Sequence, residues 1–199
     1  MDLRSYYFPL RALRFLFFSV FDTALTKGNN TFYRSPSLMS TLILFATKHG
    51  CTEKCANRLK ENLKGQTDLS NLKHKPKVQL DRYDTIVIGG SIHAGRIQKS
   101  VQTFCRKHLN TLLEKRIGLF ICCMEEGDTA QKQFEKAFPD ELREHAVATG
   151  IFGGEFSFEK MNPLERSIIK RIAKIDKSIS KISEEAINTF ISEMNKTKH

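Results

Sequence analysis

The sequence predicts an α/β domain in which a parallel sheet carries helices on both faces. Three observations support this fold class. Short apolar runs alternate with segments of helical periodicity, each apolar run ends in a loop of small or polar residues, and the 40% hydrophobic and 27% charged composition is that of a globular chain. Runs that are apolar throughout are typical of strands buried on both faces of a parallel sheet. Strands and helices that alternate at this spacing indicate right-handed βαβ units.

The predicted elements follow one another from residue 39. A strand over 42–45 leads through a polar loop into a helix with apolar positions Cys55, Ala56, Leu59 and Leu63. A weak edge-strand pattern lies near 69–72, and a strongly apolar strand covers 85–88. The later elements are a helix over 100–113, a strand over 117–122, a helix over 129–138, a strand over 146–150 and helical sequence from Pro163 onward.

Residues 1–38 differ in character from the remainder of the 199-residue chain. Three arginines precede a short apolar run over 15–21, which Asp22 interrupts, and no small-residue cleavage site follows. We expect 1–38 to be an N-terminal extension that is disordered or serves in targeting, and 39–199 to form one domain. No apolar run approaches the roughly 20 residues of a membrane-spanning helix.

Charge and cysteine content limit the partners and the compartment. The net charge is +10, of which about +3 lies in 1–38, so the folded part is itself basic and favours anionic partners. Nucleic acid is not expected, because no reading motif accompanies the charge. Five cysteines without a CxxC pair indicate free thiols and a reducing, cytoplasmic compartment, with at most a peripheral contact at the inner face of the cell membrane.

A phosphate-binding loop is predicted directly after the first strand. It consists of Thr47, Lys48, His49, Gly50, Cys51 and Thr52. Backbone amides at the start of a helix, together with the positive end of its dipole, bind anions. The loop lacks the second glycine of the dinucleotide-binding pattern and the Lys-Ser/Thr pair of the P-loop, so a mononucleotide phosphate fits it better. The alternative is that Gly50 only makes a tight turn and Thr52 only caps the helix.

Two further strand ends are expected to converge with this loop, because ligands of open parallel sheets bind at the carboxyl ends of the strands. The second group contains Ser91, Ile92, His93, Ala94 and Gly95, with Arg96 beside it, and the third contains Cys122, Cys123, Met124 and Glu125. No metal site is expected, because the histidines are scattered and the Cys51–Cys55 spacing has no partner motif.

Residues 41–52, 83–96 and the loop near Cys122 together resemble the flavodoxins. The closer resemblance is to the menaquinone-dependent protoporphyrinogen oxidase branch, through LILFATKHGCT, YDTIVIGGSIHAG and, more loosely, the segment 150–174. This resemblance implies a three-layer sandwich with a five-stranded parallel sheet of order 2-1-3-4-5. It also implies flavin mononucleotide (FMN), its phosphate held by 47–52 and its ring bordered by 91–95 on one side and 122–125 on the other.

The resemblance implies an FMN-dependent oxidoreductase of heme biosynthesis that passes electrons from a porphyrinogen-like substrate to a quinone. Two departures from the family pattern are Ala46, in place of a hydroxyl residue, and a short acidic loop over 124–128. An electron-transfer flavoprotein without its own substrate and a flavin-free interaction protein remain alternatives. His93 and Arg96 are the candidate catalytic side chains, and backbone amides are the preferred donors to the flavin.

A late basic helix over 165–182 is a further expectation. Its isoleucines recur at spacings of three and four residues, with lysines and arginines on another face. One interpretation is a helix packed on the sheet with a solvated basic side. The other is a surface that contacts an anionic membrane or the propionates of a porphyrin.

Overall fold

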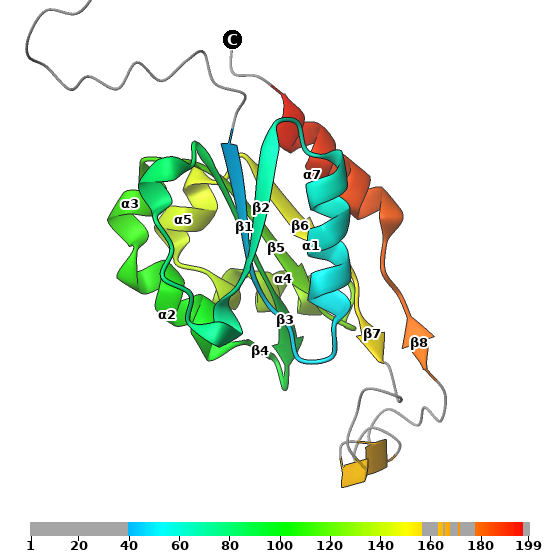
Figure 1. Ribbon diagram of the computed structural model, residues 1–199. Coiled ribbons are helices and arrows are strands. Elements are labelled where there is room, and N and C mark those ends of the chain that lie inside the picture. The colour runs from blue at the N-terminus through cyan, green and yellow to red at the C-terminus, as the bar shows by residue number, and fades with distance from the viewer. Residues whose placement is uncertain (1–39, 157–162, 165, 168–170, 172–177, 197–199) are drawn as a thin grey trace, which may run out of the picture. The chain divides into compact units, whose positions relative to one another are not determined.

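The computed structural model describes residues 40–156, 163–164, 166–167, 171 and 178–196. Its centre is a parallel sheet formed by β1 (Ser40–Ala46), β2 (Gln66–Asn71), β3 (Thr85–His93), β5 (Arg116–Cys122) and β6 (Ala148–Ile151). The strand order is β2-β1-β3-β5-β6, with the short β4 (Arg96–Ile97) antiparallel to β3 (Figure 1). When β4 is left aside, this is the predicted order 2-1-3-4-5, and the predicted fold class is confirmed. The predicted extension 1–38 lies outside the described residues.

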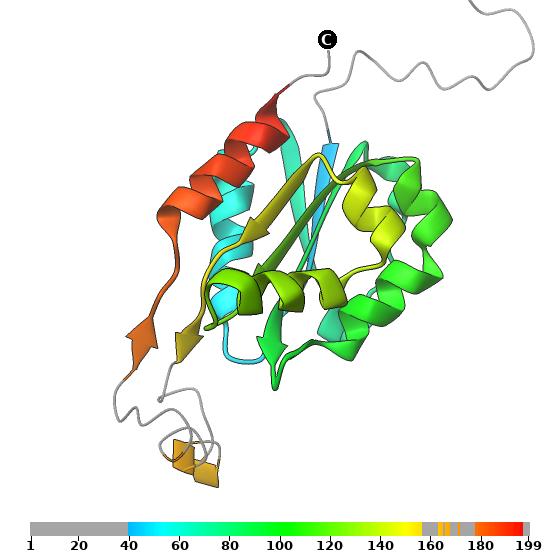
Figure 2. The same ribbon diagram turned by 180° about the vertical axis from the view of Figure 1, so that it is seen from behind.

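Helices cover both faces of the sheet and complete three layers (Figures 1 and 2). One face carries α1 (Cys51–Asn62) and α7 (Glu184–Asn195). The other carries α2 (Lys99–Lys107), α3 (Leu109–Leu113), α4 (Gly127–Ala137) and α5 (Asp140–His145). Two short 3-10 helices, η1 (Leu72–His74) and η2 (Leu80–Arg82), connect β2 to β3. On the face that carries α1 and α7, α1 starts at the carboxyl end of β1, where the phosphate loop is predicted.

The apolar runs form strands because each strand has a core on either side. Along β1, Leu42 and Leu44 belong to one buried cluster and Ile43 and Phe45 to the other, as the alternating side chains of a strand require. On the α1 and α7 face, Phe120 stacks on Phe152 at 4.7 Å between ring centroids. This double burial explains why the strands appear in the sequence as continuous rather than alternating apolar runs.

The edge strand and the second helix differ from their predicted bounds. The edge strand β2 begins at Gln66, before the weakly apolar segment at 69–72, and pairs in register with β1 from Ser40↔Gln66. Its hydrogen bonds to β1, rather than its own side chains, therefore fix the strand. The predicted helix over 100–113 is interrupted at His108, whose backbone leaves the helical region (φ −111°, ψ 16°) and separates α2 from α3.

The prediction of a continuous basic helix over 165–182 is wrong at its C-terminal end. Ile179 and Ser180 form β8, which pairs antiparallel with β7 (Glu155–Phe156). The Lys181 amide then donates a hydrogen bond of 2.8 Å to the Gly154 carbonyl oxygen, just before β7. This amide is therefore bonded to the neighbouring segment and not within a helix. Residues 165, 168–170 and 172–177 lie outside the described residues. Within the described part of the chain, no helix combines the length and apolar character that crossing a bilayer requires.

Candidate functional site

The predicted phosphate loop is a tight turn between β1 and α1. Gly50 caps the helix in the left-handed region (φ 91°), which a residue with a Cβ adopts only at a cost. The Gly50 amide donates to the Thr47 hydroxyl at 2.9 Å, so this hydroxyl closes the turn as an acceptor and keeps its own proton to donate. The amides of the first helical turn, from Cys51 onward, have no acceptor within the helix and point out of its N-terminus.

Thr52 does not cap the helix, contrary to the alternative interpretation. Gly50 holds the cap position without a side-chain hydrogen bond, and Thr52 lies inside the first turn. Thr52 is fully buried, and its hydroxyl oxygen has no hydrogen-bond partner among the described residues. A buried hydroxyl without a partner costs about 1–3 kcal/mol. An anion at the start of α1 would supply the missing partner.

The second loop is the tip of the β3–β4 hairpin. Ala94 (φ 48°) and Gly95 (φ 74°) form its two-residue turn, and His93 pairs with Arg96 across it. The side chains of His93, Ala94 and Arg96 are exposed, whereas Ile92 is half-buried. The tip therefore projects beyond the sheet at the carboxyl ends of the strands, where Figure 1 shows β3 extending past its neighbours.

Gln98 fixes the base of this hairpin, a role that the sequence patterns do not predict. Its Oε1 accepts from the Ser91 amide at 3.0 Å, and its Nε2 donates to the Ser91 hydroxyl. The Ser91 amide, predicted among the donors to the flavin, is therefore occupied by Gln98. Gly90 leaves room for this side chain, because an added Cβ there would lie 2.7 Å from Gln98 Oε1.

The first two loops converge as predicted. The rings of His49 and His93 lie 5.9 Å apart in an edge-on arrangement. His93 Nε2 also lies 3.0 Å from the Ser91 hydroxyl. These contacts hold the exposed imidazole of His93 beside the phosphate loop, where a ligand that spans both loops would meet it.

The two halves of the third loop differ in burial. Cys122 and Cys123 are buried on opposite faces of the sheet, so their side chains do not border an open site. Met124 is half-buried and Glu125 is exposed. The Cys123 amide donates to the Gly153 carbonyl at 3.0 Å, which ties this loop to the segment after β6. Of the predicted third group, only Met124 and Glu125 have side chains that are not buried in the core.

Charged contacts that no local pattern revealed surround the start of α1. Lys54 Nζ lies 2.7 Å from Glu155 Oε2, and the Glu155 hydrogen bond raises the pKa of Lys54. Lys181 pairs with Glu126 at 2.6 Å. The first pair links α1 to β7, and the second links the third loop to the segment between β8 and α7.

Three thiols meet under the start of α1. Cys122 and then Cys55 donate hydrogen bonds that lower the pKa of the Cys51 thiol to about 4. The same contact, first with Cys51 and then with Cys55, raises the pKa of Cys122 well above its ordinary value. All five cysteines are unbridged and buried, as the sequence predicted for free thiols.

A basic hollow lies beside the hairpin base, with a volume of about 800 Å³. Its apolar wall includes Leu72, Val78 and Phe104. Its cationic residues are Lys75, Lys77, Lys99 and Lys107, and no acidic residue lines it. Its lining comes from the segment 72–78, which follows β2, and from the length of α2 with His108.

Comparison with known proteins agrees with the fold. A family model described as a flavodoxin domain matches residues 42–183. Over 77 residues the chain is 39% identical to protoporphyrinogen IX dehydrogenase [quinone] of Escherichia coli (strain K12), a match covering 37% of this chain and 42% of that protein. The chain thus spans less than half the length of this curated relative.

Solved structures with a similar fold are more distant in sequence. The flavodoxin, WrbA-like protein from Agrobacterium tumefaciens is 13% identical with a TM-score of 0.49, over 79% of this chain and 93% of that one. Oxidised flavodoxin 1 from Bacillus cereus is 13% identical with a TM-score of 0.43, over 78% and 96% of the two chains.

Proposed function

Because the chain belongs to the flavodoxin domain family, we propose that it binds FMN at the carboxyl end of its sheet. The observation that carries this proposal is the start of α1. There, outward-pointing amides, a left-handed Gly50 and the buried, unpartnered Thr52 hydroxyl together suit a phosphate monoester. The fit therefore rests on the chemistry of this chain and not on similarity alone.

Residues of the three loops would contact different parts of FMN. The amides after Gly50 and the hydroxyls of Thr47 and Thr52 would hold its phosphate. The hairpin tip at 92–95 and the loop residues Met124 and Glu125 would border its ring. When bound, FMN supplies electron-transfer chemistry in one- or two-electron steps. The exposed imidazole of His93 is positioned to exchange a proton with a substrate at the same edge.

We further propose that the chain is an oxidoreductase that takes electrons from a porphyrinogen-like substrate and delivers them to a quinone. The relative from Escherichia coli bears that activity in its name. The basic hollow adds support, because a lining that combines apolar residues with four lysines suits a large apolar molecule with carboxylates. Lys99 opens α2 directly after the β3–β4 hairpin, so the hollow adjoins the second flavin loop.

One observation favours a second function, an electron carrier without its own small-molecule substrate. The third loop between β5 and α4 is short, and its Glu125 and Glu126 are exposed, as is Asp128 in the first turn of α4. A short loop leaves the neighbouring hairpin tip accessible to a partner protein. The carrier and the enzyme share the same flavin site and differ only in what reduces the flavin.

The test has two stages. The purified chain is titrated with FMN, and quenching of flavin fluorescence measures binding; a chain that takes up no FMN refutes both functions. The loaded protein is then mixed without oxygen with protoporphyrinogen, and bleaching of the flavin absorbance is followed. Bleaching, with reoxidation by a menaquinone analogue, supports the enzyme. Binding without bleaching refutes the enzyme and leaves the carrier.

A further inference from the structure

Three cysteines from two elements form a sulfur cluster on the α1 side of the sheet. Cys51 and Cys55 lie one turn apart at the start of α1, and Cys122 ends β5. The three sulfur atoms lie within 4.8 Å of one another, and the Cys55 and Cys122 sulfurs are 3.7 Å apart. The side chains are 6%, 1% and 2% exposed, respectively. The fold therefore supplies the partner that the Cys51–Cys55 spacing lacks in the sequence.

The distances within this sulfur cluster suit a shared ion. Three sulfurs bonded to one central ion at about 2.3 Å, the length of a zinc–thiolate bond, lie about 4 Å from one another. The observed separations, 3.7 Å between Cys55 and Cys122 and no more than 4.8 Å for the other pairs, reach that arrangement with changes of less than about 1 Å. Because Cys51 and Cys55 project from one helix and Cys122 from a strand under it, packing of α1 on the sheet already orients them.

The kind and number of ligands select the ion. Among the described residues, no histidine, carboxylate or further cysteine joins the group as a fourth ligand. Structural zinc sites are almost always four-coordinate, whereas soft thiolate ligands select monovalent copper, which accepts three of them. A hard cation such as Mg²⁺ is disfavoured, because it prefers oxygen ligands.

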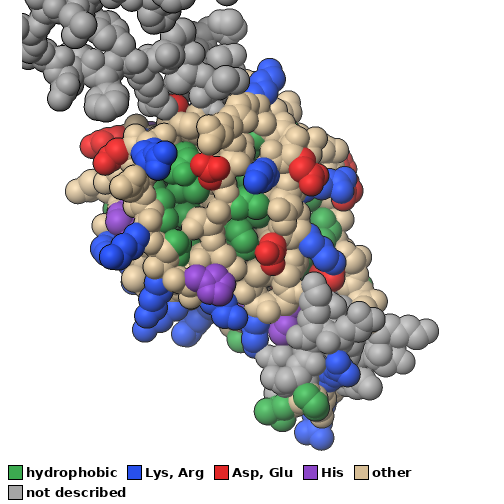
Figure 3. All heavy atoms as spheres, viewed as in Figure 1, with side chains coloured by type: hydrophobic (Ala, Val, Ile, Leu, Met, Phe, Trp, Pro, Cys, Tyr) green, Lys and Arg blue, Asp and Glu red, His purple; other side chains and the backbone are tan. Residues whose placement is uncertain are grey.

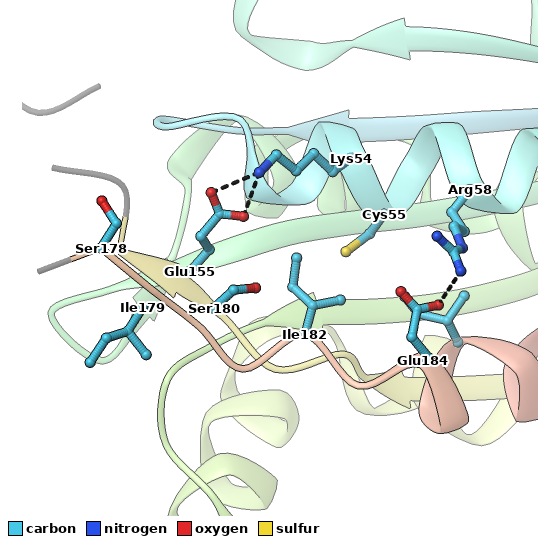
Figure 4. Close-up of a pocket in the computed structure, with 10 residues that line it drawn as sticks. Lys54, Cys55, Arg58, Glu155, Ser178, Ile179, Ser180, Ile182 and Glu184 are labelled. Carbon is cyan, nitrogen blue, oxygen red and sulfur yellow. Dashed lines mark hydrogen bonds and ion pairs between the residues drawn. The ribbon is translucent and has the colours of Figure 1, made fainter. Parts of the chain in front are cut away.

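The surroundings provide access and compensating charge. Cys55 also lines a hollow of about 400 Å³ between α1 and the segment from β8 to α7, so the cluster borders an opening (Figure 4). The Lys54 ammonium, which pairs with Glu155, also acts on Cys51 and Cys55, and the positive end of the α1 dipole adds to it. Both stabilise thiolates that have released their protons to solvent on binding a metal.

We propose that Cys51, Cys55 and Cys122 form a binding site for one monovalent copper ion. The ion would bridge the first turn of α1 to the end of β5. This site lies on the α1 face of the sheet and adjoins the predicted phosphate loop through Cys51, but copper uptake can be measured without FMN.

The test uses the full chain, reduced and freed of metal without oxygen. Copper(I) is offered from a competing chromophoric chelator, and the absorbance of the chelator reports transfer. We expect one copper per chain, a sulfur-to-copper charge-transfer band in the ultraviolet, and an X-ray absorption spectrum with a sulfur-only shell. A reduced chain that takes no copper from the chelator overturns the proposal.

Matched alanine variants distinguish the cluster from ordinary buried thiols. Cys55→Ala and Cys122→Ala should each weaken copper binding at least 100-fold. Cys105→Ala and Cys123→Ala remove equally buried thiols outside the cluster and should bind copper as the parent does. Equal binding by all four variants overturns the proposal.

Two further measurements keep the test decisive. Copper should raise the melting temperature of the parent and of the two control variants but not that of the two cluster variants. A cooperative melting transition of the cluster variants also shows that they fold. Zinc should bind at least 100-fold more weakly than copper(I). Tighter zinc binding, or a Cys55–Cys122 disulfide in air with no copper uptake after its reduction, refutes the copper site.

Discussion

Thr52 gives the sharpest residue-scale test of the phosphate loop, because Thr67 is a matched control. Both hydroxyls are buried without a partner in the described part of the chain. Thr67 lies opposite Thr41 at the amino end of the sheet, far along the strands from the loops. We expect Thr52→Val to weaken FMN binding at least about 10-fold, the loss of one charge-assisted hydrogen bond, while Thr67→Val leaves it unchanged.

The same two variants separate binding from folding. Removal of a buried hydroxyl that lacks a partner is neutral or stabilising, so both valine variants without FMN should unfold at denaturant concentrations at or above that of the parent. Thr52→Ser, which keeps the hydroxyl, should retain FMN affinity. Equal FMN affinity of Thr52→Val and the parent would show that this hydroxyl does not contact the phosphate.

Tyr83 makes a residue-scale prediction about stability and pH. Its hydroxyl donates to Asp68 Oδ2 at 2.9 Å and so ties the edge strand β2 to the start of β3. Tyr83→Phe should lower the free energy of unfolding by about 1 kcal/mol. Burial, followed by the hydrogen bond to Asp68, raises the pKa of Tyr83 above its ordinary 10.0.

The sign of the pH dependence follows from this raised pKa. Below pH 10 the phenol keeps its proton in both states, so the full stabilisation is present. As the pH rises past 10, the unfolded chain loses the proton first, and the stabilisation declines until the folded-state pKa is passed. The difference in free energy of unfolding between the parent and Tyr83→Phe, measured with urea, should be smaller at about pH 10.5 than at about pH 8. A difference that grows with pH would contradict the assignment.

At the scale of elements, Gly153 controls how the C-terminal segment docks. Its backbone is left-handed (φ 74°), and an added Cβ would collide with the Lys181 carbonyl oxygen. Gly95 has the same φ but open space around it, so Gly95→Ala pays only the backbone strain. We expect Gly153→Ala to destabilise the protein by about 2 kcal/mol more than Gly95→Ala, since collision adds to strain. Thermal unfolding of the two variants measures this, and equal melting temperatures would show that the segment yields without cost.

Elements were predictable where the chain itself carries the determinant. The strand over 42–45 and the glycine before α1 are local patterns, and both appear where the sequence places them. The edge strand β2 is polar and is defined by pairing with β1, so its start at Gln66 was not evident. Ile179 has a helical spacing, yet pairing with Phe156 draws it into β8.

The candidate site likewise combines contacts that local sequence predicts with contacts that depend on tertiary packing. The convergence of the first two loops could be inferred from the rule for parallel sheets, and the contact between His49 and His93 agrees with it. The Gln98 bonds to Ser91 and the meeting of Cys122 with the α1 thiols depend on how separate elements pack. No spacing along the chain encodes these contacts.

At the scale of the whole molecule, the positive charge is unevenly distributed around the fold. Figure 3 shows Lys and Arg side chains gathered along the lower edge in that view, where the strands end, while acidic groups are scattered over the upper face. The lysines of the basic hollow belong to α2 and to the connection that follows η1. A field of this sign raises the local concentration of anionic molecules and speeds their capture.

Charge reversal in the basic hollow tests whether this field serves the proposed substrate. The double variant Lys99→Glu and Lys107→Glu should lower kcat/KM for a carboxylate-bearing porphyrinogen about 10-fold at low salt, and salt should narrow the difference by screening. Lys60→Glu with Lys64→Glu makes the same change in net charge in the last turn of α1 and just after it, on the other face of the sheet, and should leave kcat/KM within about 2-fold of the parent. Reoxidation of the reduced protein by an uncharged quinone should be unaffected in both. Equal losses in the two double variants would mean that net charge, and not the hollow, governs capture of the substrate.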